Sequence, residues 1–182
     1  MFYKIIALKL ELLNKWKQHN KCIAVGEKCI GKSKDNEHYN ADLSRIHYEV
    51  AKAYWVKEKN KDKALKHIFA AIERDNSNSN TMRLLRVIED KRSGKSKYFR
   101  INIEGQAQGV TKLKGKIMNF ISTYDVVAEN KNEALDYIKR FEPEAVPDSM
   151  MIKECEVLKK NINDHKGVYK YSGGIFYFPF EE

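Results

Sequence analysis

Residues 41–75 read ADLSRIHYEVAKAYWVKEKNKDKALKHIFAAIERD and contain two apolar stripes. In each stripe, apolar side chains recur three and four residues apart, and Lys59–Asp62 interrupts the pattern between them. The members of the two stripes are Leu43, Ile46, His47, Val50 and Tyr54, then Ala64, Leu65, Ile68, Ala71 and Ile72. This periodicity predicts two amphipathic helices joined by a short turn.

The same helical period extends over most of residues 2–92, with polar breaks near Gly31–Asn40 and Asn76–Asn80. Met82, Leu85 and Ile88 predict one more helix, which we expect to end around residues 91–94 at two cations and a glycine. Residues 1–94 are therefore expected to form four or five consecutive helices.

Two parts of this half look like copies of one unit. A shift of 42 residues aligns Cys22 and Cys29 with Ala64 and Ala71, and a large apolar residue follows each of these small ones. Small residues seven apart let neighbouring helices approach closely on one face. Here the chain resembles the tetratricopeptide repeat family. The family's helix–turn–helix pattern has an Ala-Tyr pair, two small residues and an Asp-Pro pair after the second helix. In this chain Ala53-Tyr54, Ala64, Ala71 and Asp75-Asn76 occupy those places.

The resemblance covers residues 41–78 closely and 5–36 loosely, although the 42-residue offset exceeds the family's repeat of about 34 residues. It implies antiparallel helical hairpins that stack and expose a face for binding a protein partner. On that face we place His47, Tyr54, Lys57 and Lys61 as partner-contacting residues.

After Lys97 the apolar period changes to two. The segment Tyr98–Glu104 alternates and predicts a strand, and a second strand is expected within Ile117–Ala128. A helix is predicted from Asn130 to Phe141, with Asn130 as its N-cap.

The rest of this half contains one ambiguous segment and one expected hairpin. Met150–Leu158 fits both a helix and a strand, and we favour the strand. Gly167–Tyr171 and Ile175–Phe178 predict a terminal hairpin around Ser172–Gly174. We therefore expect an α+β protein: tetratricopeptide-like hairpins in residues 1–94, then a small α/β domain of four to five strands and one helix in residues 98–182.

Positive charge is concentrated in the first half of this +9 chain. Residues 1–97 hold 22 Lys and Arg against 12 Asp and Glu, whereas residues 98–182 hold 12 against 13. Such a half attracts an acidic protein, nucleic acid or an anionic membrane surface, and charge alone does not choose among them. Three sparse cysteines and the lack of a signal-peptide pattern favour a cytoplasmic protein.

Residues 26–33, GEKCIGKS, match the P-loop pattern letter for letter. In that interpretation the backbone around Gly26 and Gly31 wraps phosphates, Lys32 contacts them and Ser33 binds magnesium. A P-loop follows a buried strand and opens a packed helix, but the residues after Ser33 are almost entirely polar. We prefer the alternative, in which Cys22–Ile30 is a helix that Gly31 terminates.

No catalytic or metal-binding set is evident. His19, Cys22, Cys29 and His38 are the only metal candidates, and on one helix the two cysteines lie about 10 Å apart along the axis. That separation is too large for both to bind one zinc ion. We therefore predict no enzyme activity, no cofactor and no metal.

Two further features bear on binding. Ile175–Phe180 carries four aromatic residues, and alternation places Phe176 and Phe178 on one face, either inside the protein or at an interface. Lys112, Lys114 and Lys116 follow the first strand, where lysines beside aromatic residues would favour RNA.

The preferred hypothesis is a non-enzymatic protein-interaction module or adaptor that binds a protein partner without membrane insertion, and the basic half favours an acidic segment of that partner. A bacterial immunity or antitoxin-type binding protein is a narrower version of it. A nucleic-acid-binding protein and a P-loop nucleotide-binding protein remain as alternatives.

Overall fold

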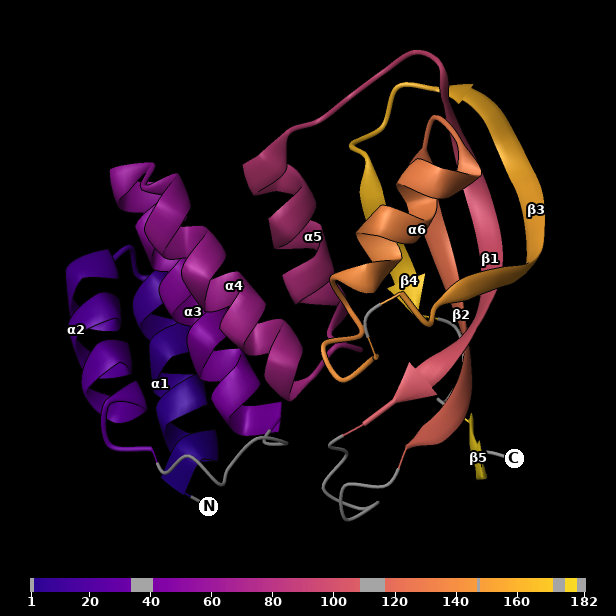
Figure 1. Ribbon diagram of the computed structural model, residues 1–182. Coiled ribbons are helices and arrows are strands. Elements are labelled where there is room, and N and C mark those ends of the chain that lie inside the picture. Colours follow the sequence, from indigo (N-terminus) through magenta and orange to yellow (C-terminus); the bar gives the residue numbers. More distant parts are fainter. Residues whose placement is uncertain (1, 34–40, 109–116, 147, 172–175, 180–182) are drawn as a thin grey trace. The chain divides into compact units, whose positions relative to one another are not determined.

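The structure is a computed structural model that describes residues 2–33, 41–108, 117–146, 148–171 and 176–179. The chain divides into two compact units, Met1–Glu89 and Asp90–Glu182, called the N-terminal and C-terminal units below. The first is helical and the second is built on a sheet (Figure 1). The α+β class expected from the sequence is confirmed.

The described residues of the N-terminal unit form five helices, which are α1 (Phe2–Lys15), α2 (His19–Ile30), α3 (Ala41–Glu58), α4 (Lys61–Arg74) and α5 (Ser79–Glu89). Helix α3 is central, since it packs against each of the other four. The apolar stripes form the core, in which Leu10, Leu43, Ile46, Val50 and Ile68 are fully buried. No helix among the described residues is both long and apolar enough to cross a membrane.

Local signals explain several helix ends. Asn60 caps α4 by accepting a hydrogen bond from the Lys63 N–H at 3.1 Å. The end predicted for the fifth helix was too late: α5 stops at Glu89, and Asp90 adopts a left-handed conformation with φ 47°. A left-handed residue at this position is a common helix terminator, and glycine is not required there.

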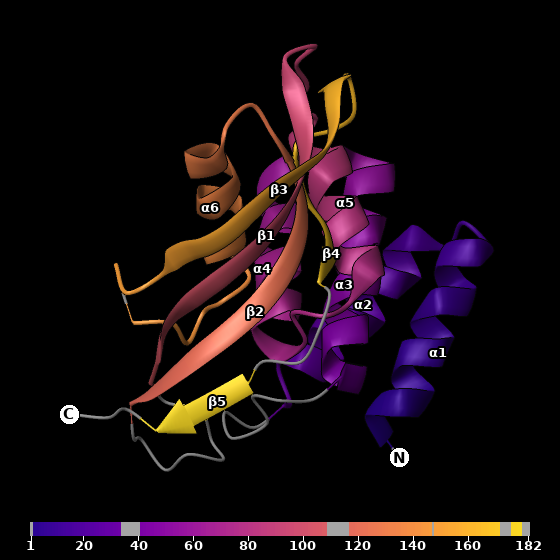
Figure 2. The ribbon, with the colours of Figure 1, turned by 90° about the vertical axis from the view of Figure 1, so that its right-hand side faces the viewer.

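The C-terminal unit is a five-stranded antiparallel sheet with one helix. Its elements are β1 (Ser96–Ala107), β2 (Met118–Ala128), α6 (Lys131–Lys139), β3 (Met151–Ile162), β4 (Gly167–Tyr171) and β5 (Phe176–Pro179). The strand order is β3-β1-β2-β4, and β5 also pairs with β2. Helix α6 packs on one face of the sheet (Figure 2). The choice of a strand for the ambiguous segment is confirmed by β3.

The predicted terminal hairpin was wrong. Strand β4 pairs with Tyr124–Val127 of β2 and β5 pairs with Met118–Ile121, both antiparallel (Figure 2). The two strands therefore follow one another along the same edge of β2 instead of pairing together. The long β2 strand offers enough backbone donors and acceptors for both, which a local turn signal cannot reveal.

Strand β3 forms the other edge of the sheet, and its side chains are almost all exposed. Three register irregularities interrupt its pairing with β1, and Lys153, Lys159 and Lys160 lie along it. Bulges and lysines are the usual protection of an edge strand against pairing with another chain.

Candidate functional site

A tight turn connects α1 and α2 and forms the base of a pocket. Lys17 adopts a left-handed conformation with φ 58°, and the Gln18 N–H donates to the Leu13 carbonyl at 2.8 Å. The Lys17 N–H donates to the Asn14 carbonyl at 3.0 Å. These bonds satisfy carbonyl groups that the end of α1 would otherwise leave unpaired, and they hold the turn in one shape.

A pocket of about 320 Å³ opens at this turn. Its lining residues are Lys17, Gln18, His19, Asn20, Lys21 and Lys57. All six are polar, three are lysines and none is acidic. The Lys57 ammonium donates to the Asn20 side-chain oxygen, which brings the end of α3 to the first turn of α2. We call these six residues the basic pocket.

The start of α2 adds to the positive potential of the basic pocket. Gln18 is the N-cap residue but makes no side-chain capping bond, and the first turn of α2 contains no acidic residue. The first N–H groups of a helix have no partner within the helix, and the helix dipole favours an anion near them. The arrangement therefore suits a carboxylate or another anion.

A chain of buried polar contacts anchors the pocket to the core. The His19 ring lies 3.0 Å from the Asn14 side-chain oxygen. The Asn14 amide donates to the Glu49 carbonyl at 2.9 Å and to its carboxyl at 2.6 Å. Burial raises the pKa of Glu49, while the hydrogen bond from Asn14 acts in the opposite direction. The His19 side chain of the pocket is thus connected, through Asn14, to the packed interface of α1 and α3.

A second concave surface lies between α3 and α5, with a volume of about 300 Å³. Its lining residues are Tyr48, Lys52, Val56, Asn80, Arg83, Leu84 and Val87. It also contains two cations and no carboxylate, but its floor is more apolar than that of the basic pocket. The N-terminal unit therefore presents two cation-lined depressions.

Two of the sequence-predicted partner residues lie in a buried polar cluster. His47 is 4% exposed, and its Nδ1 lies 3.1 Å from Nδ1 of His67. The Tyr54 hydroxyl donates to Glu27 at 3.1 Å, and the Nε2 atom of His67 lies 3.1 Å from the same carboxylate oxygen. The cluster joins α2, α3 and α4, so His47 and Tyr54 act on any partner only through the residues that they hold in place.

The buried surroundings control protonation in this cluster. Burial lowers the pKa of His47 to about 3, with further lowering by the charges of Arg74 and His67. Burial also lowers the pKa of His67, while Glu27 acts in the opposite direction. Both rings are therefore neutral near pH 7.

The two exposed lysines among the predicted partner residues do not lie at the same site. Lys57 lines the basic pocket, whereas Lys61 is exposed at the first position of α4 and lines neither depression. The prediction missed Lys17, Gln18, His19, Asn20 and Lys21, although the polar run at residues 17–21 was a visible signal for a helix break.

The predicted aromatic contacts lie in β5. Phe178 pairs with Asn119 and Phe176 with Ile121 in the ladder to β2. Phe178 is half-buried. Lys112, Lys114 and Lys116, the basis of the RNA alternative, lie outside the described residues.

Residues 26–33 do not form a phosphate loop. Gly26 is buried inside α2, where an added Cβ would lie 2.1 Å from Cγ2 of Val50, so the glycine permits close packing on α3. Gly31 ends α2, and the Ser33 hydroxyl donates to the Ile30 carbonyl at 2.7 Å. This is the carbonyl end of a helix, whose dipole disfavours phosphate. The helical interpretation of Cys22–Ile30 is confirmed.

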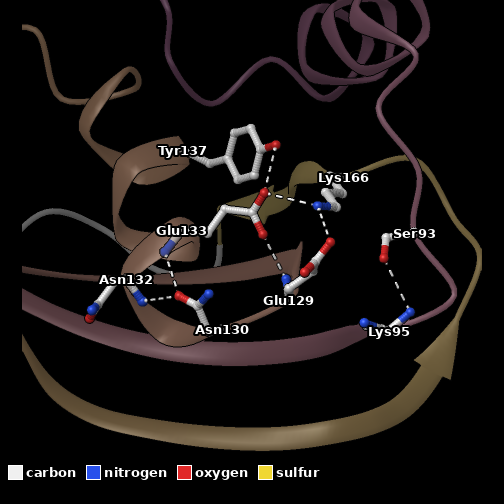
Figure 3. Close-up of polar contacts among 8 residues, drawn as sticks. All are labelled: Ser93, Lys95, Glu129, Asn130, Asn132, Glu133, Tyr137 and Lys166. Carbon is white, nitrogen blue, oxygen red and sulfur yellow. Dashed lines mark hydrogen bonds and ion pairs between the residues drawn. The ribbon is translucent and has the colours of Figure 1, made fainter.

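A polar cluster in the C-terminal unit connects α6 to the strands (Figure 3). The Lys166 ammonium donates to Glu129 at 2.7 Å and to Glu133 at 3.1 Å. The Asn130 side chain accepts from the N–H groups of Asn132 and Glu133, both at 3.0 Å, and caps α6 as predicted. The Lys166 ammonium thus holds two carboxylates next to the start of α6, and we assign the cluster a structural role.

Comparisons with protein-family models, curated proteins and solved structures find no match to this chain.

Proposed function

We propose that the N-terminal unit is a protein-interaction module that binds an acidic segment of a partner protein at the basic pocket. The observation that supports this proposal is the lining of the pocket, with three lysines, three other polar side chains and no carboxylate. A carboxylate entering it would meet ammonium groups and the open N–H groups of α2 together.

The packing of the helices supports a tetratricopeptide-like arrangement. Helix α1 contacts α2 and α3, α2 contacts α3, and α3 contacts α4 and α5. A stack of helical hairpins has this neighbour pattern, and such stacks commonly serve as binding scaffolds. The three cysteines, all among the described residues, form no disulfide bond, and we propose the cytoplasm, where thiols stay reduced, as the compartment.

The test uses a fluorescein-labelled peptide of alternating Glu and Gly, without large apolar residues, in fluorescence anisotropy titrations. Lys21→Glu and Lys57→Glu together should weaken binding at least tenfold, because each replaces an attraction in the pocket by a repulsion. Lys61→Glu makes the same charge change as Lys21→Glu alone, but outside the pocket, and should have a much smaller effect than that single variant. Equal losses for Lys61→Glu and Lys21→Glu would show only general electrostatic attraction and contradict the proposal.

A second experiment separates a protein partner from nucleic acid. A photo-crosslinking amino acid at Gln18 should give discrete protein adducts in native cell extract, and the pocket variants should abolish them. A single-stranded DNA oligomer serves as the competing probe, since binding dominated by phosphates falls steeply with salt. Tighter binding to this oligomer than to the peptide, with such a salt dependence, would favour nucleic acid.

A further inference from the structure

Helix α1 is apolar on two opposite faces. Ala7, Leu10 and Leu13 are buried on one face, where α1 packs in the N-terminal unit. The other face exposes Phe2, Ile5, Leu8 and Leu12, and Trp16 continues it one residue beyond the end of α1, where its N–H still donates to the Leu12 carbonyl at 2.9 Å. Each of these five side chains is 45% to 62% accessible to solvent. At 100° per residue they fall within an arc of about 120°, over a length of about 21 Å. We call these five residues the α1 stripe.

The α1 stripe is concentrated and not a scatter of single exposed residues. It supplies five of the twelve exposed large hydrophobic side chains identified in the described part of the chain. Isolated apolar residues on a surface need no explanation, but a continuous stripe marks a surface that another molecule covers.

The charges around the α1 stripe indicate what covers it. Lys9 lies within the arc, and Lys4 and Lys15 lie beside one edge. Glu11 is the only acidic residue of α1, and it already pairs with Arg45 at 3.2 Å. Among the described residues, no carboxylate lies within ion-pair distance of the three lysines. The stripe is thus apolar with uncompensated positive charge.

The α1 stripe also leads directly to the basic pocket. Its last member, Trp16, precedes Lys17, the first residue of the pocket lining. One extended ligand that covers α1 therefore arrives at the three lysines of the pocket.

We propose that the α1 stripe binds an amphipathic helix of the partner protein, one whose apolar side is flanked by Asp or Glu and whose acidic end enters the basic pocket. This inference rests on the proposed function and adds the class of partner. A helix laid along α1 matches the length and width of the stripe, and apolar side chains at three- and four-residue spacing cover it. Its carboxylates pair with Lys4, Lys9 and Lys15.

Two other occupants fit the charges less well. An antiparallel second copy centred on the stripe brings Lys9 of one copy beside Lys9 of the other, where like charges repel. A lipid surface attracts lysines at the border of an apolar helix face. Lys9, however, lies within the arc of the α1 stripe and not at its border. A carboxylate at a fixed position of a protein sequence can pair with it there.

The experiment measures the fluorescence emission of Trp16. The chain has two tryptophans, and Trp55→Phe leaves Trp16 as the single one. The probe is a tryptophan-free helical peptide of eighteen residues with a leucine stripe and glutamates on both flanks. A second peptide carries glutamine in place of every glutamate. Binding over the stripe removes the Trp16 indole from water and shifts its emission to shorter wavelength.

We expect the glutamate peptide to shift the emission and to bind roughly tenfold more tightly than the glutamine peptide. Lys9→Glu and Leu12→Ser should each weaken binding by about tenfold. Leu158→Ser, which removes a similarly exposed leucine from β3, serves as the matched control and should leave binding unchanged.

Three results would overturn the inference: equal binding of the two peptides, a larger shift with vesicles of phosphatidylcholine and phosphatidylglycerol, or a shift on raising the protein concentration alone. The vesicle result would assign the α1 stripe to a membrane surface, and the concentration result would assign it to a second copy. Each leaves the proposed function standing if the apolar-free Glu-Gly peptide still depends on Lys21 and Lys57.

Discussion

In each unit a glycine allows two elements to pack closely, but the side chains next to the two glycines differ. In the N-terminal unit, a Cβ on Gly26 would meet Val50 at 2.1 Å. In the C-terminal unit, a Cβ on Gly105 would meet Met150 and Phe120, each at 2.9 Å. Val50 is β-branched and fully buried, so it has little freedom to move. Of the two neighbours of Gly105, Phe120 is also fully buried, but Met150 is flexible and half-buried. The helical interface should therefore tolerate less change than the sheet.

The units also bury ionisable groups of opposite pH dependence. His47 has a pKa lowered to about 3 by burial, so protonation of the unfolded chain destabilises the fold as pH falls from 6.5 towards 3. In the C-terminal unit, Glu142 accepts hydrogen bonds from Ser122 at 2.9 Å and Tyr124 at 2.6 Å. Burial raises the pKa of Glu142, so its contribution to stability improves as pH falls through that raised value.

The largest effect is expected at Gly26. Gly26→Val should lower the free energy of unfolding by about 3 kcal/mol, because two β-branched side chains cannot occupy the same space between α2 and α3. Both tryptophans lie in the N-terminal unit, so their fluorescence in urea reports this unit. Adding Val50→Ala should recover part of the loss, and additive effects of the two changes would disprove the close contact.

The next effect concerns the pH dependence of the N-terminal unit. Between pH 7 and pH 5, His47 should account for a loss of about 2 kcal/mol in unfolding free energy, from a pKa of 6.5 unfolded and about 3 folded. His47→Gln should remove this loss, so that the unfolding free energy measured in urea changes less between pH 7 and pH 5 than it does in the unaltered protein. Glu142→Gln is the control. It changes the other unit, so the pH dependence of the unfolding free energy measured by tryptophan fluorescence should stay the same.

A smaller effect is expected at Gly105. Gly105→Ala should cost about 1 kcal/mol, because the flexible Met150 side chain can move away and the buried Phe120 ring has to shift only slightly. Thermal unfolding followed by far-ultraviolet circular dichroism measures the loss. A cost as large as that of Gly26→Val would remove the distinction between the two interfaces.

The smallest effect separates charge from backbone strain at the basic pocket. The pocket turn has Lys17 at φ 58°, in the left-handed region where only glycine is free of steric cost. Lys17→Gly should stabilise the fold by at most about 1 kcal/mol, since glycine adopts this conformation without steric cost. The same variant should bind the Glu-Gly peptide more weakly, and unchanged anisotropy would exclude Lys17 from the site.

Much of the fold was predictable because the apolar period differs between the two halves. The stripes of α3 and α4 and the alternation of β1 report which face each element buries. The order of strands along β2 was not predictable in this way. The segments of β4 and β5 have turn residues between them, and only the ladder decides that both pair with β2.

The candidate site was predicted only in part. Of the predicted partner residues, Lys57 lines the basic pocket. Lys17 and Lys21 were not predicted, because the basic pocket forms where the α1–α2 turn meets the end of α3. Tyr54 and His47 were expected to face a partner, and the packing of α2 and α4 around α3 buries them instead.

The amino-acid sequence by itself determined the α+β class, most helix and strand positions, and the excess of positive charge in the first half, since these follow from local periodicity and composition. The tertiary structure decided which lysines share a pocket, which polar groups become buried, and which apolar face of α1 remains exposed. Those properties depend on contacts between residues far apart in the chain, and no local pattern specifies such contacts.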